Sequence, residues 1–353
     1  MNRQFIRGIL GAAVAALAVS LLAASPAVAV DDAAILAKRP PKQLSAFGFF
    51  ADATAQIPAE GLLPFAPATP LFTDFAEKRR FVYVPEGKAA EYHAEESFRF
   101  PVGSALVKTF AYPDDSADGL HLVETRVLLH QESGWQAWAY VWNEDQSEAE
   151  LNITGAKIAM NIPLPDGGMK PITYAVPNKN QCKGCHAIDG AITPIGPKAR
   201  NLNHDFQYGV ETENQLARWV EAGLLADAPQ PAEAPSVPDW LDEAAPLEDR
   251  AKAWLDINCA HCHRREGPAS NSGLFLTWGE TDQTAYGIKK RPVAAGRGSG
   301  GLHFDIAPGE PDKSIVIYRV DSTEPGVMMP ELGRSLTDPR AVELLRNWIA
   351  SLR

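Results

Sequence analysis

The chain has 353 residues, 45% of them hydrophobic, so it is long enough for about two domains with packed cores. Its 44 acidic residues outnumber its 33 basic residues, and the formal net charge is −11. A surface this acidic argues against nucleic acid as a partner, because a phosphate backbone would be repelled.

The N-terminus indicates an export signal. Arg3 and Arg7 precede an uncharged stretch rich in alanine and leucine, residues 8–30, which contains the small-x-small signal peptidase pattern Ala27-Val28-Ala29. We expect a signal peptide over residues 1–29, whose two arginines leave with it, so that the formal charge becomes −13. The length of the stretch would also permit an uncleaved membrane anchor. No other apolar run is long enough to span a bilayer, and we therefore predict a periplasmic protein with no membrane span after signal cleavage.

A β-rich N-terminal module is predicted over residues 30–180. Residues 30–74 are interrupted by six prolines and are expected to wrap around the module. Runs of β-branched and aromatic residues bounded by turn residues predict strands at residues 80–84, 104–112, 120–131, 134–143, 157–162 and 171–176. In the fourth strand, Trp138, Tyr140 and Trp142 alternate with small residues, which indicates an aromatic packing face; a platform for a carbohydrate or a partner is the alternative.

The pentapeptide Cys182-Lys183-Gly184-Cys185-His186 follows, in a first haem-binding segment over residues 181–225. Two cysteines three positions apart lie on one side of a helical turn, so both thiols can reach the two vinyl groups of a porphyrin. The histidine directly after them can present its imidazole to the iron. This spacing is typical of covalent haem attachment.

The same pattern returns at Cys259-Ala260-His261-Cys262-His263, and the two copies use all four cysteines of the chain. A thioredoxin-like dithiol would not need the histidines. A zinc ribbon would place its cysteine pairs roughly 15 to 20 residues apart, whereas 73 residues separate Cys185 from Cys259. We therefore predict two covalently bound haem c groups, with His186 and His263 as iron ligands.

After the first motif, the spacing of apolar residues becomes that of a helix. Residues 213–225 carry apolar side chains at helical spacing, and a linker with four prolines follows at residues 226–239. The last module, residues 240–353, has an apolar stripe that runs into Cys259, a middle helix expected at residues 308–320, and a closing helix after Asp338-Pro339. This order predicts a class I-like cytochrome c domain. The predicted fold is α+β and multidomain: a β-rich N-terminal sandwich-like module followed by a mostly α-helical c-type cytochrome region.

The sequence assigns a distal ligand to only one iron. Met328-Met329-Pro330 lies in a proline-bounded loop after His263, and we predict Met329 as the sixth ligand of the second iron, because a thioether opposite an imidazole favours electron transfer. Ordinary core packing of both methionines is the alternative. For the first iron, His204 is the best single candidate, while Met160, Met169 or no ligand at all stay open.

Several basic residues are candidate partners for the haem propionates. They are the runs Lys289-Lys290-Arg291 and Lys78-Arg79-Arg80, together with Arg297. The alternative is that these short charge runs lie in water.

Seven stretches together resemble a family of exported bacterial dihaem c-type cytochromes with a β-rich N-terminal module. They are PVGSALVKTF (101–110), ETRVLLHQESGWQAWAYVWNEDQ (124–146), VPNKNQCKGCH (176–186), PIGPKARNLN (194–203), LDINCAHCH (255–263), PVAAGRG (292–298) and MMPELGR (328–334). They cover most of the chain from about residue 60 onward. Such proteins resemble companions of periplasmic quinoprotein dehydrogenases that oxidise sugars or alcohols. The resemblance implies that the redox partner of this chain is such a dehydrogenase.

The expected function is that of a periplasmic dihaem c-type cytochrome that transfers single electrons from a dehydrogenase to a downstream acceptor. The acidic surface would steer docking to a basic partner. The alternative is a dihaem peroxidase or oxidase with an open first haem, and a haem-linked sensor or binding module is a third possibility. Because an electron-transfer protein is favoured over a catalyst, no catalytic residue is predicted.

Overall fold

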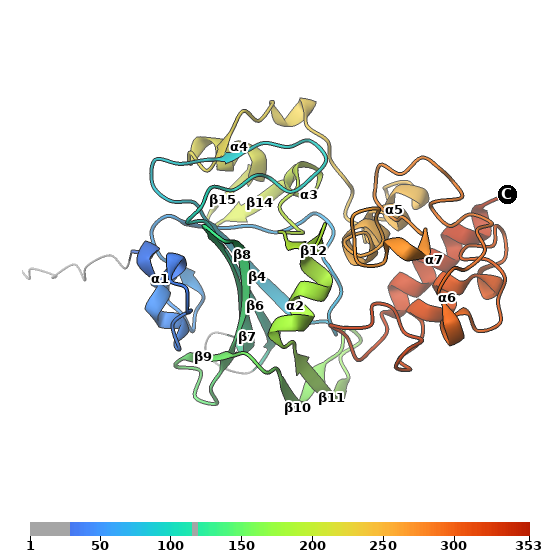
Figure 1. Cartoon of the computed structure of the whole chain (residues 1–353), viewed down its shortest axis with the longest axis horizontal. Coiled ribbons are helices and arrows are strands. Elements are labelled where there is room, and N and C mark those ends of the chain that lie inside the picture. Colours follow the sequence, from blue (N-terminus) through green and yellow to red (C-terminus); the bar gives the residue numbers. More distant parts are fainter. Residues whose placement is uncertain (1–28, 115–118) are drawn as a thin grey trace, which may run out of the picture.

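The computed structural model describes residues 29–114 and 119–353. The predicted signal peptide, apart from its last residue, lies outside the described residues. The structure has a β-rich part with a central sheet and a C-terminal part that lies beside it and carries the C-terminus on its far side (Figure 1). Within the described ranges, no helix is long and apolar enough to cross a membrane.

The central sheet has six antiparallel strands in the order β3-β4-β6-β7-β8-β9. They are β3 (Leu62–Pro64), β4 (Glu77–Tyr83), β6 (Ala105–Pro113), β7 (Leu120–Gln131), β8 (Gly134–Trp142) and β9 (Ala149–Asn152). The hairpin between β7 and β8 is closed by the pair Gln131 and Gly134. The four strands predicted between residues 80 and 143 are confirmed. Their β-branched and aromatic residues pack well on the surface of a sheet whose two faces are both covered.

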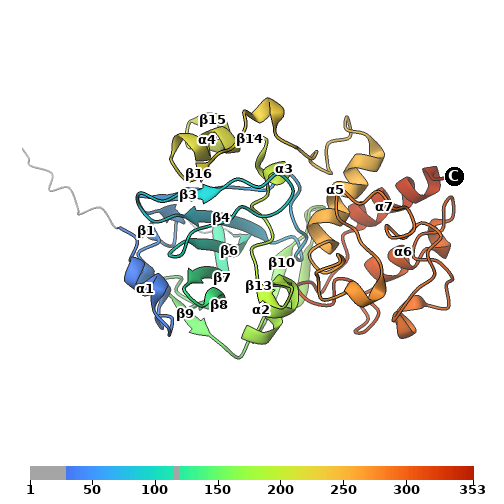
Figure 2. The same cartoon turned by 45° about the horizontal axis from the view of Figure 1, so that its top comes forward.

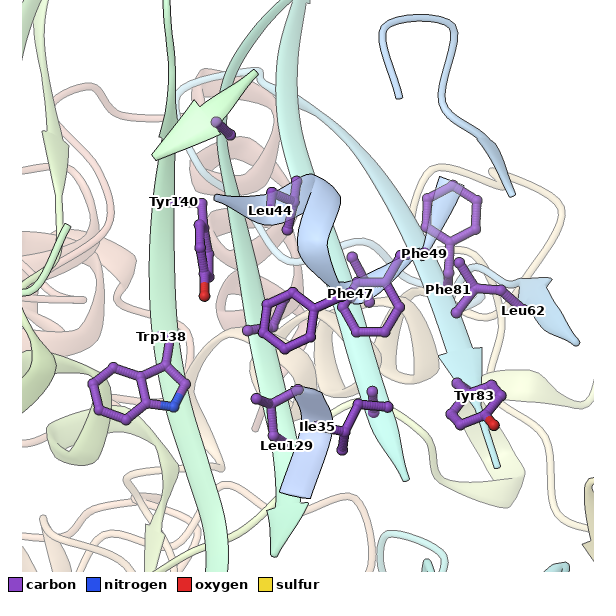
Figure 3. Close-up of a cluster of buried hydrophobic side chains, with 14 of the residues drawn as sticks. Ile35, Leu44, Phe47, Phe49, Leu62, Phe81, Tyr83, Leu129, Trp138 and Tyr140 are labelled. Atoms are coloured by element: carbon purple, nitrogen blue, oxygen red, sulfur yellow. The ribbon is translucent and has the colours of Figure 1, made fainter. Parts of the chain in front are cut away.

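One face of the sheet is covered by the N-terminal segment. This segment contains α1 (Asp32–Leu36), the 3-10 turn η1 (Leu44–Phe47), β1 (Phe50–Asp52) and β2 (Ile57–Pro58). Phe47 and Phe49 stack at 4.9 Å between ring centroids and lie over the sheet (Figure 3). Trp138, Tyr140 and Trp142 are buried in the same cluster. The aromatic residues of β8 therefore form the predicted packing face, and the proline-rich segment wraps around the sheet as expected.

The opposite face is covered by segments that flank the first cysteine pair. The hairpin of β10 (Ala156–Pro163) and β11 (Met169–Val176), both predicted, packs on one end through Ile162 and Tyr174. Helices α3 (Ala199–Leu202) and α4 (Gln215–Glu221) pack on the other end through Leu202 and Trp219. Between them, α2 (Lys179–His186) lies against β8, on the side of the sheet away from α1 (Figures 1 and 2).

The remaining strands form small two-stranded sheets. They are β5 (Ala90–Glu91) with β16 (Leu225–Ala226), β12 (Ala187–Ile188) with β13 (Ala191–Ile192), and β14 (Asp205–Tyr208) with β15 (Glu211–Asn214). Among the described residues there is one large sheet rather than two facing sheets, so the predicted sandwich-like arrangement is wrong. Chain segments and helices, instead of a second large sheet, cover the apolar faces.

The C-terminal part is not the mostly α-helical cytochrome region that the sequence suggested. Among the described residues, strand covers 28% and helix 23%. Residues 240–353 contain α5 (Leu247–Cys259), α6 (Ile315–Val320) and α7 (Pro339–Ser351), with lengths of 13, 6 and 13 residues. The predicted middle helix reduces to α6 after a 3-10 turn, because prolines and glycines in the preceding loops interrupt helical hydrogen bonding. The expected fold class is thereby corrected.

The two longer helices of this part are as predicted. Helix α5 runs into Cys259, and Asp338 caps α7 by accepting a hydrogen bond from the Arg340 backbone N–H at 3.1 Å. The two helices pack together through a buried cluster that includes Trp254 and Trp348. This packing holds the second cysteine pair at the end of a rigid helix.

Candidate functional site

The first pentapeptide forms the end of α2. Asn178 and Gln181 make a capping box, in which each side chain accepts a hydrogen bond from the other residue's backbone N–H at 2.9 Å. Cys182 and Cys185 follow one turn apart, on the same side of the helix. His186 is the last helical residue. The sequence therefore builds a short, capped helix that presents two thiols and an imidazole from adjacent positions.

The ring of His186 is oriented by a backbone carbonyl. Its Nδ1 lies 3.0 Å from the carbonyl oxygen of Thr193, which follows β13. Only a protonated nitrogen can donate to a carbonyl, so Nδ1 carries the hydrogen and Nε2 keeps its lone pair. Burial lowers the pKa of His186 to about 4, which keeps the ring neutral. A neutral imidazole with its second nitrogen tied to a carbonyl is the usual form of a metal-ligating histidine.

The second pentapeptide begins at the last residue of α5. The backbone N–H groups of Cys262 and His263 donate to the carbonyl of Cys259 at 3.1 and 2.9 Å, so the chain turns tightly after the helix. The Nδ1 of His263 lies 3.4 Å from the hydroxyl oxygen of Ser272. Burial also lowers the pKa of His263 to about 4. This motif repeats the arrangement of the first one.

The two pentapeptides lie in contact, although 73 residues separate Cys185 from Cys259. The Sγ of Cys262 donates to the carbonyl of Gly184 at 3.9 Å. A hydrogen bond with the Cys262 thiol lowers the pKa of Cys185 to about 4 and raises that of Cys262. None of the four cysteines, all of which are described, forms a disulfide. The tertiary structure thus brings the end of α2 and the turn after α5 into contact.

A cavity of about 160 Å³ opens beside the first motif. Its walls include Cys185, His186, Thr193 and His261. The Nδ1 of His261 is buried and has no hydrogen-bond partner among the described residues. His261 belongs to the second pentapeptide, so it reaches the first motif from the other anchoring turn.

The predicted distal candidate His204 lies in a different environment. Its Nε2 is 3.0 Å from the carbonyl oxygen of Ala66 and 2.8 Å from the side-chain nitrogen of Gln215. Its Nδ1 is 2.9 Å from the carbonyl oxygen of Asp205. Both ring nitrogens of His204 have partners, whereas the Nδ1 of His261 has none in the part of the chain that the structure describes.

The other two candidates lie on the β10–β11 hairpin. Met160 packs against the sheet, and Met169 is exposed. Neither lines the cavity beside His186.

The loop that carries Met329 lies beside the second motif. The buried guanidinium of Arg334 donates to the Met329 carbonyl at 2.8 Å. The charge of Arg334 acts on Cys259, and the charge of Glu331 acts on Cys262. Two charged residues of this loop therefore act on the two cysteines of the second motif. The ligation itself stays a prediction.

Three of the seven basic candidates for propionate binding already have an acidic partner. Lys290 forms a buried ion pair with Asp305 at 3.0 Å, and Arg297 pairs with Glu324 at 2.9 Å. Arg79 is exposed and lies 3.8 Å from Glu77. Lys78, Arg80, Lys289 and Arg291 form no ion pair among the described residues and stay as candidates.

Two cationic side chains close to the first motif were not among the predicted site residues. The charge of Arg126 acts on Cys182, and the charge of Lys108 acts on His186. Each cation follows an apolar or β-branched residue within a predicted strand. A charged residue inside such a strand was the only sign in the sequence that these side chains have a special role. The pairing register, which decides what such a charge faces, is not visible in the sequence.

The donor set fits haem c. Each motif offers two thiols on one turn, followed by a neutral imidazole whose Nδ1 has an oxygen partner. In the part of the chain that the structure describes, no group of three or more His, Cys, Asp or Glu side chains is placed to hold a bare metal ion. No protein-family model, no curated protein and no solved structure matches this chain.

Proposed function

We propose that this chain is an exported, periplasmic dihaem c-type cytochrome that transfers single electrons. The observation that carries the proposal is the contact between the two pentapeptides, with the Cys262 Sγ 3.9 Å from the Gly184 carbonyl. Porphyrins joined to these adjacent turns would be anchored with their edges close together. Electron tunnelling falls steeply with distance, so such a pair is suited to rapid transfer from one haem to the other.

The protein residues have separate roles in this proposal. Cys182, Cys185, Cys259 and Cys262 anchor the two haems as thioethers, and His186 and His263 are the proximal ligands. The haem irons, when bound, supply the one-electron chemistry. Met329 is the proposed distal ligand of the second iron, where a thioether raises the reduction potential.

The proposed electron donor is a periplasmic quinoprotein dehydrogenase, as the family resemblance implies. The chain has 44 acidic and 33 basic residues, so its long-range field attracts a basic docking surface. Such steering weakens with added salt, because the Debye length falls to about 8 Å at physiological ionic strength. The rate of reduction by the partner is therefore expected to fall as the salt concentration rises.

The proposal is tested by producing the chain in a periplasm that carries a haem-attachment system. After denaturation and reduction, mass spectrometry should find two covalently bound haems. The variants Cys182→Ala/Cys185→Ala and Cys259→Ala/Cys262→Ala should each keep one haem and serve as matched controls. A chain that keeps no haem would overturn the proposal.

A second measurement separates the electron carrier from the enzyme alternative. Ferrous protein is exposed to carbon monoxide, and ferric protein is supplied with peroxide and an electron donor. Two haems that bind carbon monoxide slowly or not at all, with no peroxide turnover, support the carrier. Fast binding at one haem together with peroxide turnover would show that the chain is an enzyme.

A further inference from the structure

Three cationic residues stand side by side on the central sheet. Arg80 on β4 pairs in register with Lys108 on β6, and Lys108 pairs with Arg126 on β7. Lys78 lies two residues before Arg80 and so points to the same face. We call these four residues the basic row. Like charges directly opposite one another weaken strand pairing, so the row costs stability unless negative charge is brought to it.

The acidic groups close to the basic row are already committed. Glu124 accepts from the Nε of Arg126 at 2.9 Å and from the Tyr174 hydroxyl at 2.6 Å. The charge of Asp74 reaches Lys78, but its carboxylate accepts the backbone N–H groups of Ser335 and Leu336. Four cations therefore face two carboxylates, both of which have other partners.

Arg126 is paired with Glu124, but the other three cations have no carboxylate partner among the described residues. Lys78 donates to the Ala76 carbonyl at 2.8 Å, and Arg80 donates to the Lys78 carbonyl at 3.2 Å. Lys108 and Arg126 lie over the Phe110 ring, at 4.6 and 4.3 Å from its centroid. An aromatic face attracts a cation, but it does not neutralise the charge. The row is thus built to receive an anion.

The basic row lies on the sheet face that carries the first haem motif. Helix α2 packs against β8, next to β7, on the side of the sheet away from α1 (Figure 1). The charge of Arg126 acts on Cys182, and the charge of Lys108 acts on His186. The basic row therefore begins with Arg126 on β7, near the first cysteine pair. It continues through Lys108 on β6 to Arg80 on β4.

We propose that the basic row binds the propionate groups of the haem attached to Cys182 and Cys185. This inference rests on the proposed function, because it requires that haem to be present. A haem c group carries two carboxylates, and guanidinium groups bind carboxylates with two parallel hydrogen bonds. The bound propionates supply the negative charge that Arg80 and Lys108 lack, whereas Arg126 already has Glu124. The same sheet face thus neutralises the propionates and supports the first haem.

The first test is a redox titration of the dihaem protein. Neutralising variants Arg80→Gln and Lys108→Met leave propionate charge uncompensated, which favours ferric iron. The potential of the first haem should fall, while the second haem keeps its potential. Arg79→Gln is the matched control, because Arg79 is exposed on the other face of the same strand. Lys108→Arg keeps the charge and should keep the potential. If Arg80→Gln and Lys108→Met fold but leave the reduction potential of the first haem unchanged, the proposal is overturned.

The second test compares stability with and without the first haem. In the Cys182→Ala/Cys185→Ala background, Lys108→Met removes repulsion and should raise the melting temperature. In the dihaem protein the same substitution removes a propionate partner and should lower it. A residue with only a structural role would shift both melting temperatures in one direction, and that result would contradict the site. If the unmodified chain binds no haem at all, the proposed function fails instead, so the two failures are distinguishable.

Discussion

Arg200 and Asp256 form a buried, two-pronged ion pair that joins the segment after the first pentapeptide to the helix that runs into the second. The guanidinium nitrogens lie 2.9 to 3.1 Å from the carboxylate oxygens, and each side chain is 4% exposed. Asp256 also accepts the Trp278 backbone N–H at 3.0 Å, and Arg200 donates to the Glu95 carbonyl at 2.6 Å. Because Asp256 lies three residues before Cys259, this pair helps to set the separation of the two anchoring turns.

Breaking this pair should be costly. Arg200→Met leaves the Asp256 carboxylate buried without its partner, and we expect a loss of about 3 to 5 kcal/mol in the free energy of unfolding, measured by urea denaturation. The control is Arg99→Gln, which removes an ion pair with Glu91 whose side chains are 71% and 68% exposed. That change should cost about 0 to 1 kcal/mol. Equal losses in the two variants would show that the buried pair contributes no more to stability than the exposed one.

The conformation of the loop that carries Met329 should depend on Asp74, a residue of the β-rich part. The Asp74 carboxylate accepts the backbone N–H groups of Ser335 and Leu336 at 2.7 to 2.8 Å. Asp74→Ala leaves these donors unpaired, and we expect a loss of about 1 to 3 kcal/mol. Hydrogen exchange at Ser335 and Leu336 should accelerate.

Asp74→Asn is the matched control for this loop. Asp74 has a φ of 43°, which asparagine tolerates, and the amide oxygen can still accept from the loop. The asparagine variant should therefore protect both amides better than the alanine variant. The anchoring role would be refuted if the two variants exchanged at the same rate.

We expect His261 rather than His204 to be the distal ligand of the first haem, because the buried Nδ1 of His261 has no hydrogen-bond partner among the described residues and His261 lines the cavity beside His186. We expect ferrous His261→Ala protein to bind carbon monoxide rapidly at one haem, and its ferric absorption spectrum to change. His204→Ala should leave both properties unaltered. The opposite pattern would return the assignment to His204.

Met329 and its neighbour offer a second matched pair. Met329→Ala should lower the potential of the second haem, because an iron that loses a thioether ligand favours its ferric state. Met328→Ala should have little effect on this potential. A redox titration of both variants distinguishes the ligand from the packing residue, and equal shifts would count against Met329.

The basic row should give the chain without its first haem a distinctive pH dependence. Burial and the neighbouring Arg80 lower the pKa of Lys78 to about 7, whereas a lysine in the unfolded chain titrates near 10.4. Between these values the unfolded chain binds more protons, so the free energy of unfolding should rise with pH. Urea denaturation of the Cys182→Ala/Cys185→Ala variant between about pH 6 and 10 measures this slope. Adding Lys78→Met should reduce it, and an unaltered slope would contradict the shifted pKa.

Local patterns predicted much of the secondary structure. The strands β7 and β8, the helix α5 that ends in Cys259, and the Asp338-capped α7 follow from alternation, helical spacing and capping, which act over a few residues. The C-terminal fold class did not follow, because the order of two helices and a haem motif does not determine how glycine- and proline-rich loops between them fold.

The sequence by itself determined the chemistry of each anchoring turn, because two thiols and an imidazole within five residues need only one helical turn to come together. Only the tertiary structure decided that Cys262 meets Gly184, that Arg200 meets Asp256, and that Arg80, Lys108 and Arg126 stand in one row. These contacts join residues that are far apart in the chain. They depend on strand register and on the packing of the two parts, and no local pattern specifies either.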